Sequence, residues 1–401
     1  MPGGCGETVA LVRSAAAARY DLGHGHPMRA ARAELAIELA TSLGVLERPS
    51  WREVAAQPAE MADLGLVHDL TYLAVVRSAE RMPEPILQSM GLATEDTPIF
   101  PGIHDAASAV VGATQQACFS VWHGETVHAV NLLGGLHHAM PGFASGFCVY
   151  NDLAVGIKDL LRNGCRRVAY IDLDAHHGDG VEAVFRDDPR VLTISLHQDG
   201  RTIFPGTGAA TDIGVAPALG YAVNVPLPPG TGNSGWLRAL SAVVPVLLRE
   251  FRPEVIVTQC GCDAHRDDPL TDLSLTTEGF AIAYSLVHDL AHELCEGRWV
   301  IVGGGGYDLG SAVPRTWAQL LAEVSGGPLP ASTELPQPWR QLAERMSGQP
   351  APVTLGDEDA APCWRKWDAG EGDPDDAVDR SVAAARREVL PLHGLDPLSD
   401  R

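Results

Sequence analysis

Two short runs, IDLDAHHGDG and QCGCDAHRDDPL, carry the carboxylates and imidazoles that a metal centre needs. Asp174 and His176 lie two residues apart after an apolar run, so their side chains can point the same way. Asp263 follows a second apolar run and could complete a set of three ligands. Such a set suits a borderline cation such as zinc and leaves positions open for water and a substrate oxygen. The pattern predicts a catalytic metal site, although DxDxH alone is also typical of a capping and turn cluster.

A pair of histidines, His137 and His138, follows a Gly-Gly turn and could transfer protons. A neutral imidazole can take a proton from an attacking water near pH 7 and return it to a leaving amine. Such histidines need carboxylates to fix the tautomer, and Asp172 and Asp179 flank the metal motif at suitable positions. Two adjacent loop histidines are often only exposed, but the neighbouring polar motifs favour an acid–base role.

The run GGGGYD, residues 303–308, places a tyrosine hydroxyl after four glycines. Glycines let a backbone approach a ligand closely, and the Tyr307 hydroxyl could donate to a developing oxyanion. The alternative is a glycine-rich turn followed by a core tyrosine.

These motifs follow apolar runs that read as buried strands of a parallel sheet. Strands are expected over 8–11, 127–132, 167–171, 191–195, 221–225, 255–258 and 299–302. Helices are expected over about 151–163, capped by Asn151 and ended by Gly164, over 234–250 with a kink at Pro245, and over 277–296, ended by Gly297. This alternation predicts one doubly wound α/β sheet, whose ligands bind at the carboxyl ends of its strands.

Composition narrows the classes of protein that fit. The 401 residues hold 29 basic and 51 acidic side chains, a net charge of −22, which argues against a nucleic-acid binder and is compatible with a basic partner. Eight scattered cysteines without a CxxC pair indicate a reducing cytoplasm. The first residues do not read as a signal peptide, and no apolar run is long enough to span a membrane. Residues 326–353 are rich in proline and 357–379 are acidic, which predicts a solvated tail wrapping the domain, with an interaction segment as the alternative.

Seven runs in this order resemble the zinc-dependent histone deacetylases of the arginase/deacetylase superfamily. They are GHPMRAAR, GIHDAASAVVGAT, GGLHHA with SGFCVYND, IDLDAHHGDG, FPGTG, QCGCD and GGGGY. PVTLGD and PLHGLDP look like the bacterial acetoin-utilization (AcuC-type) branch. The resemblance covers about residues 20–320. It implies a catalytic domain over 1–320 and a C-terminal extension over 321–401 that packs on or trails from it.

The resemblance implies a deacetylase that releases acetate from acetylated lysine side chains of proteins. It carries over Asp174, His176 and Asp263 as ligands of zinc, with iron(II) as the alternative, His138 as general base and acid, His137 as its electrostatic neighbour, and Asp172 and Asp179 as their orienting carboxylates. Tyr307 matches the residue that polarises the scissile carbonyl. The substrate tunnel would be formed by Gly146, Phe147, Phe204, Leu270 and, at its rim, Asp96, and the acetate-exit channel by Arg32.

The resemblance also implies structural potassium held by backbone oxygens. Matching positions are Asp172, Asp174, His176, Ser195 and Leu196 for one ion, and Phe185, Asp188, Val191 and Tyr221 for another. This sequence departs from the family in having Met140 where a lysine is frequent and Cys262 where alanine is usual. Cys262 should face away from Asp263 as a small core residue.

Three other functions compete with protein deacetylation. The same chemistry could act on acetylpolyamines or another small N-acetyl amide. A catalytically silent binding protein is disfavoured because every ligand, base and tyrosine position is filled. A manganese ureohydrolase would need a second set of aspartates, which is not evident around Asp263. The sequence leaves the oligomeric state open.

Overall fold

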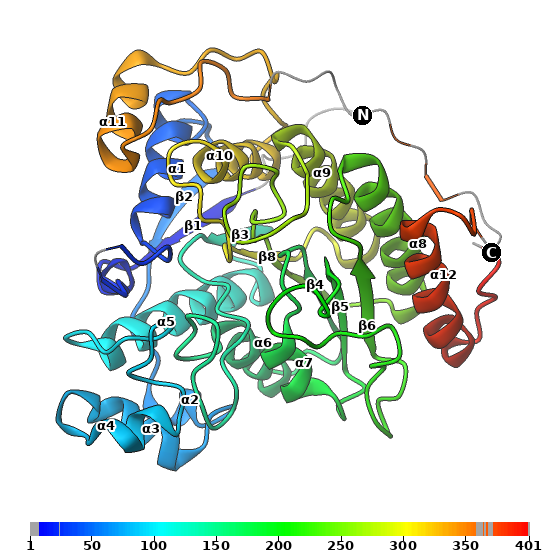
Figure 1. The fold of residues 1–401 in the computed structure, drawn as a ribbon, viewed down its shortest axis with the longest axis horizontal. Helices are drawn as coiled ribbons and strands as arrows, with labels where there is room; N and C mark the ends of the chain where they lie inside the picture. Colours follow the sequence, from blue (N-terminus) through cyan, green and yellow to red (C-terminus); the bar gives the residue numbers. More distant parts are fainter. Residues whose placement is uncertain (1–7, 24, 358–363, 365, 368–371, 400–401) are drawn as a thin grey trace.

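A single sheet of eight parallel strands organises the residues described by the computed structural model, which are 8–23, 25–357, 364, 366–367 and 372–399. The strand order is β2-β1-β3-β8-β7-β4-β5-β6, and every neighbouring pair is parallel. Helices cover both faces of the sheet (Figure 1). The prediction of one doubly wound α/β sheet is therefore confirmed.

The strands are β1 Val9–Arg13, β2 Trp51–Ala55, β3 His128–Asn131, β4 Val168–Asp172, β5 Val191–Gln198, β6 Ala222–Leu227, β7 Val255–Gln259 and β8 Trp299–Val302. The α-helices are α1 Ala31–Ser42, α2 Met61–Leu64, α3 Leu70–Arg77, α4 Glu84–Gln88, α5 Ile103–Trp122, α6 Asp152–Arg162, α7 Asp179–Phe185, α8 Asn233–Phe251, α9 Thr277–Cys295, α10 Ala312–Val324, α11 Gln337–Ser347 and α12 Ala377–Val389.

Each face of the sheet has its own apolar core. On one face, residues of α3, α5 and α6 pack against alternate strand residues such as Ala129, Val257 and Val300. On the other face, α1, α8, α9 and α10 pack against the strand residues in between, such as Val130 and Ile301. Because successive strand side chains point to opposite faces, a strand covered on both sides is apolar throughout. This explains why the buried strands were recognisable in the sequence.

All seven predicted strands are present, and the one that the sequence did not indicate is β2. This edge strand pairs only with β1 and has the sequence Trp-Arg-Glu-Val-Ala, in which no residue is buried. An exposed edge strand needs no apolar run, so its pattern did not distinguish it from a loop.

The predicted helix ends also hold. The Asn151 side chain accepts a hydrogen bond from the backbone N–H of Ala154 at 2.9 Å, which caps α6. Gly164, just past the end of α6, has a left-handed backbone (φ 97°), a conformation that glycine adopts without strain. α8 runs through Pro245, and α9 ends one residue before the left-handed Glu296.

Two helices, α11 and α12, lie in the C-terminal region, where the sequence predicted a solvated tail wrapping the domain and indicated no helix. Part of its acidic stretch, residues 358–363, 365 and 368–371, lies outside the described residues. The buried Trp339 of α11 donates from its indole Nε1 to the carbonyl of Leu35 in α1 at 3.0 Å. The buried Arg238 of α8 contacts Asp376 at 2.6 Å and Asp379 at 2.5 Å at the start of α12. We propose that the described residues of 321–401 pack on residues 1–320 rather than trail from them.

Replacing Trp339 tests this packing. We expect Trp339→Ala to lower the free energy of unfolding by about 3–5 kcal/mol, because it leaves a large cavity and removes a buried hydrogen bond. Gln341→Ala, at an exposed position of the same helix, is the matched control. Denaturant unfolding measures both variants, and equal stability would show that α11 contributes little to the fold.

Among the described residues, none of the helices combines the length and apolar character that crossing a bilayer requires.

Candidate active site

Four neighbouring strands deliver the chemical motifs to one edge of the sheet. β3, β8, β7 and β4 are consecutive in the strand order, and each of them is followed directly by one motif. His137 follows β3, Gly303 follows β8, Asp263 follows β7 and Asp174 follows β4. Because all four strands are parallel, their carboxyl ends meet, as the sequence predicted.

The three predicted metal ligands converge there. His176 Nδ1 lies 3.0 Å from Asp174 Oδ1 and 2.9 Å from Asp263 Oδ2, and one ligand atom from each residue falls within 4.8 Å of the others. All three residues are buried. The arrangement has the donor types and the spacing of a three-ligand site for a divalent cation.

The charges at this point fit a cation. Burial, and then the neighbouring Asp174, raise the pKa of Asp263 to about 8, because two buried carboxylates face each other. A bound cation would relieve that repulsion. A Cβ atom at Gly305 would clash with the carboxylates of Asp263 and Asp174, and one at Gly261 would clash with Asp174. Glycine at these two positions therefore keeps room for the ligand oxygens, which explains part of the GGGGY run.

Further donors fix the two carboxylates. Asp174 Oδ2 accepts from Gln259 Nε2 at 2.6 Å and from the Gly305 backbone N–H at 2.8 Å. Asp263 Oδ1 accepts from the Ala175 backbone N–H at 2.7 Å. These hydrogen bonds within the protein orient the ligand oxygens of Asp174 and Asp263. Gln259 stands inside the QCGCD run, yet its type alone did not indicate this role.

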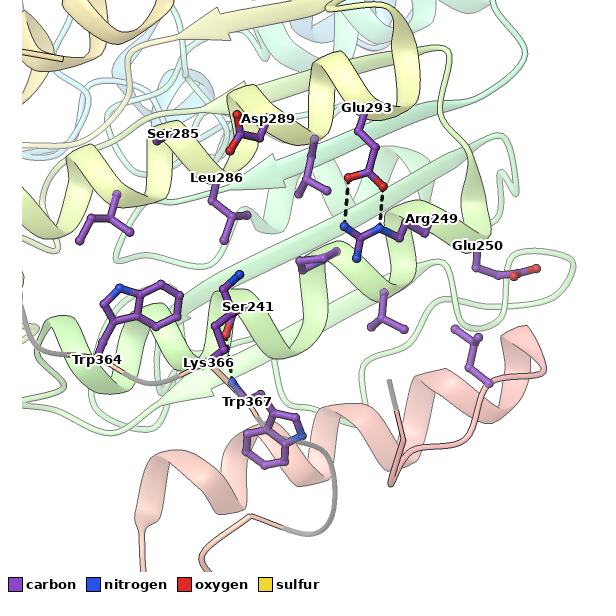
Figure 2. Close-up of a pocket in the computed structure, with 15 residues that line it drawn as sticks. Ser241, Arg249, Glu250, Ser285, Leu286, Asp289, Glu293, Trp364, Lys366 and Trp367 are labelled. Carbon is purple, nitrogen blue, oxygen red and sulfur yellow. Dashed lines mark hydrogen bonds and ion pairs between the residues drawn. The ribbon is translucent and has the colours of Figure 1, made fainter. Parts of the chain in front are cut away.

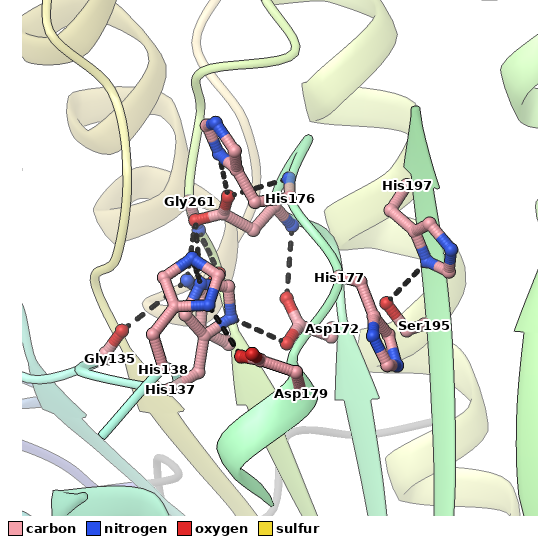
Figure 3. A network of polar contacts seen from close by, with 12 residues as sticks. Gly135, His137, His138, Asp172, His176, His177, Asp179, Ser195, His197 and Gly261 are labelled. Carbon is pink, nitrogen blue, oxygen red and sulfur yellow. Dashed lines mark hydrogen bonds and ion pairs between the residues drawn. The ribbon is translucent and has the colours of Figure 1, made fainter. Parts of the chain in front are cut away.

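The paired histidines lie beside this cluster, each oriented by its predicted carboxylate (Figure 3). His137 Nδ1 lies 2.8 Å from Asp172 Oδ2, and His138 Nδ1 lies 2.7 Å from Asp179 Oδ1. Each Nδ1–H therefore donates to a carboxylate. The two Nε2 atoms lie 3.0 Å apart, close enough to share a proton. Both rings are buried, so the alternative of an exposed pair is wrong.

The two rings differ in charge. Burial lowers the pKa of His137, but Asp172 and Asp174 outweigh that effect and raise the pKa to about 9. Burial and the neighbouring charge of His137 lower the pKa of His138 to about 4. The carboxylates therefore favour the protonated form of His137, while burial beside His137 favours the neutral form of His138. Only His138 also lines the pocket described below.

Tyr307, which follows the glycine-rich run, lines the same pocket as His138 and His176. Its backbone N–H donates to Asp268 Oδ2 at 2.7 Å, and the same carboxyl group accepts from the Leu270 backbone N–H at 2.9 Å. Burial, and then Asp263 and Asp174, raise the pKa of Tyr307 well above its usual value, so the phenol stays protonated. It therefore remains a hydroxyl donor at physiological pH.

A pocket of about 290 Å³ opens onto these groups. It is lined by Asp96, His138, Gly146, Phe147, His176, Ile203, Phe204, Leu270 and Tyr307. The side chains of Phe204 and Leu270 are exposed at 44% and 39%, and Asp96 is also exposed. The structure thus brings together all five residues predicted to bind substrate. The pocket has apolar walls and one acidic group.

The conformation of Gly146 keeps this pocket open. Gly146 and Phe147 both have left-handed backbones, with φ of 50° and 68°. A Cβ atom at Gly146 would clash with the His138 ring and approach Phe204. A larger residue would therefore fill the space between the two aromatic walls.

Arg32 lies behind Tyr307 rather than in the pocket. It donates to the carbonyls of Gly304 at 3.0 Å and Gly306 at 2.6 Å, and its guanidinium carbon is 5.5 Å from the ring centres of Tyr307 and Trp317. The cavity beside it measures about 10 Å³, room for roughly one water molecule. Passage of acetate here would require side chains to move.

The positions matched to potassium lie in two groups. Asp172, Asp174, His176, Ser195 and Leu196 are buried at or just past the carboxyl end of β4 and on β5. Phe185, Asp188, Val191 and Tyr221 lie at the opposite end of the sheet, where the carbonyls of Phe185, Asp188 and Tyr221 each accept a backbone hydrogen bond. The second carbonyl lone pairs could serve an ion, and both potassium sites stay predictions.

Cys262 is fully buried and belongs to the apolar core, as expected of a small core residue.

Asp152 is a site residue that the sequence analysis missed. It accepts hydrogen bonds from the backbone N–H groups of Gly135 and Leu136 and from the Thr114 hydroxyl. It thus anchors the turn that presents the histidine pair. The YND run that contains Asp152 was noticed, but a carboxylate directly after a helix cap is usually explained by the helix itself.

A second and larger groove, about 700 Å³, lies between α8, α9 and the residues Trp364, Lys366 and Trp367 (Figure 2). An ion pair between Arg249 and Glu293, at 2.7 Å, crosses it. Its lining contains no histidine, cysteine or metal-ligand cluster. The 290 Å³ pocket is the candidate active site because, unlike this groove and the small cavity beside Arg32, it is lined by histidines, one of which belongs to the metal-ligand cluster.

Comparison with known proteins agrees with this geometry. Residues 26–324 match the histone deacetylase domain family. The chain is 43% identical over 303 residues to the acetoin utilization protein AcuC of Bacillus subtilis, covering 75% of this chain and 78% of that protein. It is 34% identical over 310 residues to AcuC of Staphylococcus xylosus, covering 77% and 80%. The crystal structure of a histone deacetylase homologue from Aquifex aeolicus superposes with a TM-score of 0.81 at 28% identity, covering 94% of this chain and all of that one.

Proposed function

This chain belongs to the histone deacetylase family, and from that premise we propose that it hydrolyses the acetyl amide of acetylated lysine side chains in proteins, releasing acetate. The observation that carries the proposal is the pocket itself. Its apolar walls lead to His138 and Tyr307, with the three ligand residues beneath. A long methylene chain fits between Phe147 and Phe204, while its acetyl end reaches the polar groups.

We propose a divalent metal held by Asp174, His176 and Asp263, with zinc as the first candidate and iron(II) as the second. When bound, the metal supplies a Lewis acid for the acyl oxygen and acidifies the attacking water. The chain's own side chains must then place the substrate and move the protons.

His138 is the proposed general base. Its Nδ1–H is committed to Asp179, so Nε2 is the only nitrogen that can receive the proton of the attacking water. Asp172 favours the protonated form of the adjacent His137, which would stabilise the negative charge that develops on the acyl oxygen. His138 then returns the proton to the departing lysine amine. The acid and the base are thus one residue acting in turn.

Tyr307 is the proposed donor to the oxyanion. Its hydroxyl stays protonated, and Asp268 fixes the backbone that carries it. An oriented donor in a site with little water stabilises the charge that develops on the acyl oxygen.

Tyr307→Phe should lower kcat by about 10²- to 10³-fold and leave metal content and folding unchanged, because only a hydroxyl is removed. Steady-state kinetics with an acetyl-lysine peptide, combined with elemental analysis of the same sample, measures this. Full activity of the metal-loaded variant would remove Tyr307 from the mechanism.

The substrate class is tested by turnover on acetyl-lysine peptides and on acetylspermidine with one metal-loaded sample. We expect higher kcat/KM on the peptides, since Phe204 and Leu270 give the rim an apolar character and Asp96 is the one acidic residue lining the pocket. Turnover of acetylspermidine alone would instead identify a small-amide deacetylase. No turnover of either substrate would contradict the proposed reaction.

We also propose a reducing, cytoplasmic setting. The six cysteines in the described part of the chain are free and buried, which supports this proposal.

A further inference from the structure

A cluster of three histidines lies at the end of the sheet opposite to the active site. His128 begins β3, whereas the catalytic motif follows the end of that strand. His288 and His292 stand one helical turn apart on α9, so both rings lie on one face of that helix. The mechanism proposed above uses none of these side chains.

The ring nitrogens of the cluster converge. His288 Nε2 lies 3.0 Å from His128 Nε2 and 3.1 Å from His292 Nε2. One ligand atom from each ring falls within 4.8 Å of the other two. Three imidazoles that share a tetrahedral cation, with metal–nitrogen bonds of 2.0–2.1 Å, have nitrogens about 3.3 Å apart. A small outward shift of the rings is enough to admit an ion.

Without an ion, the three imidazoles cannot all form good hydrogen bonds with one another. His288 Nδ1 lies 2.9 Å from Glu323 Oε1 of α10, so the proton of this ring sits on Nδ1. Its Nε2 then offers one lone pair to two neighbouring imidazole nitrogens. A cation at the centre would accept a lone pair from every Nε2 instead.

Glu323 supplies the carboxylate that such a site needs behind one ligand. A metal-binding histidine usually donates its other N–H to a carboxylate, which fixes the tautomer. Glu323 is buried, and its second oxygen has no hydrogen-bond partner within the described structure. The Nδ1 atom of the buried His128 is likewise without a partner there.

The cluster is accessible from one side. His128 is fully buried, His288 is half-buried and His292 is exposed. An ion can therefore enter past His292 and keep one position for water. From this geometry we propose that His128, His288 and His292 form a second metal site, selective for a late first-row divalent cation such as Zn²⁺. Imidazole nitrogens favour such ions over Mg²⁺ or Ca²⁺, which prefer oxygen.

A bound ion would tie β3 to α9 and, through Glu323, to α10. The site is separate from the active site, so it adds an equivalent of metal to the one proposed for catalysis. Binding only to the folded chain would also raise the melting temperature.

Metal stoichiometry tests the proposal. The full chain, without a polyhistidine tag, is stripped of metal and titrated with Zn²⁺ against a chromophoric chelator. We expect two equivalents for the wild type, one for His288→Ala/His292→Ala, and one for Asp263→Asn, which keeps the histidine site alone. Glu323→Gln should weaken the second equivalent by about 10- to 100-fold.

Two controls keep the test decisive. His123→Ala, an exposed histidine outside the cluster, should still bind two equivalents. His292→Ala changes an exposed side chain only, so it should lose the second equivalent while circular dichroism shows a folded chain. A single equivalent in the wild type, or two retained in the double variant, would overturn the proposal.

Discussion

His138→Ala is expected to lower kcat on an acetyl-lysine peptide by about 10²- to 10⁴-fold, the usual range for loss of a general acid–base group. The expected loss follows from the position of the ring. His138 is the neutral member of the pair, its Nδ1–H is held by Asp179 at 2.7 Å, and it alone of the two lines the pocket. No other neutral imidazole lining this pocket is available to replace it, because His176 is a proposed metal ligand.

The control for this variant is His123→Ala, which removes an exposed imidazole that does not line the pocket. It should keep the kcat of the wild type. Metal content and the melting temperature of His138→Ala need to match the wild type, so that the loss reports chemistry rather than unfolding. If the loaded, folded variant kept more than a tenth of its turnover, His138 could not be the principal base.

The second large effect is expected from Asp263→Asn. The substitution keeps the shape of the side chain but removes one anionic ligand from a set of three. The carboxylate uses Oδ1 to accept from the Ala175 backbone N–H at 2.7 Å and has Oδ2 beside His176 Nδ1 at 2.9 Å, whereas the amide offers only one oxygen for these two positions. We expect the site to lose its metal, and turnover to fall by about 10⁴-fold, since Lewis-acid assistance is worth several kcal/mol.

Asp267→Asn is the matched control, because this carboxylate lies in the same loop and is exposed. It should retain metal and turnover. Elemental analysis after gel filtration and kinetics on the same samples measure both variants. An Asp263→Asn protein that is empty of active-site metal yet fully active would contradict a metal-dependent mechanism.

The sequence by itself determined the sheet and indicated the residues that meet at the candidate active site. Buried parallel strands are apolar throughout, so seven of the eight strands were visible as short apolar runs, and the polar residues directly after them had to lie at one edge. That reasoning indicated Asp174, His176, Asp263, the histidine pair and Tyr307. Local patterns encode such features because strand periodicity and turn chemistry act over a few residues. The edge strand β2 was missed since none of its residues is fully buried.

Only the tertiary structure decided what depends on contacts between distant segments. It buried both members of the histidine pair and shifted their pKa values in opposite directions: Asp172 and Asp174 raise the pKa of His137, whereas burial and the neighbouring His137 lower that of His138. It turned part of the expected C-terminal tail into helices held by Trp339 and Arg238. It also brought His128 to α9 across 160 residues. Packing selects such neighbours, and no local pattern in the chain records them.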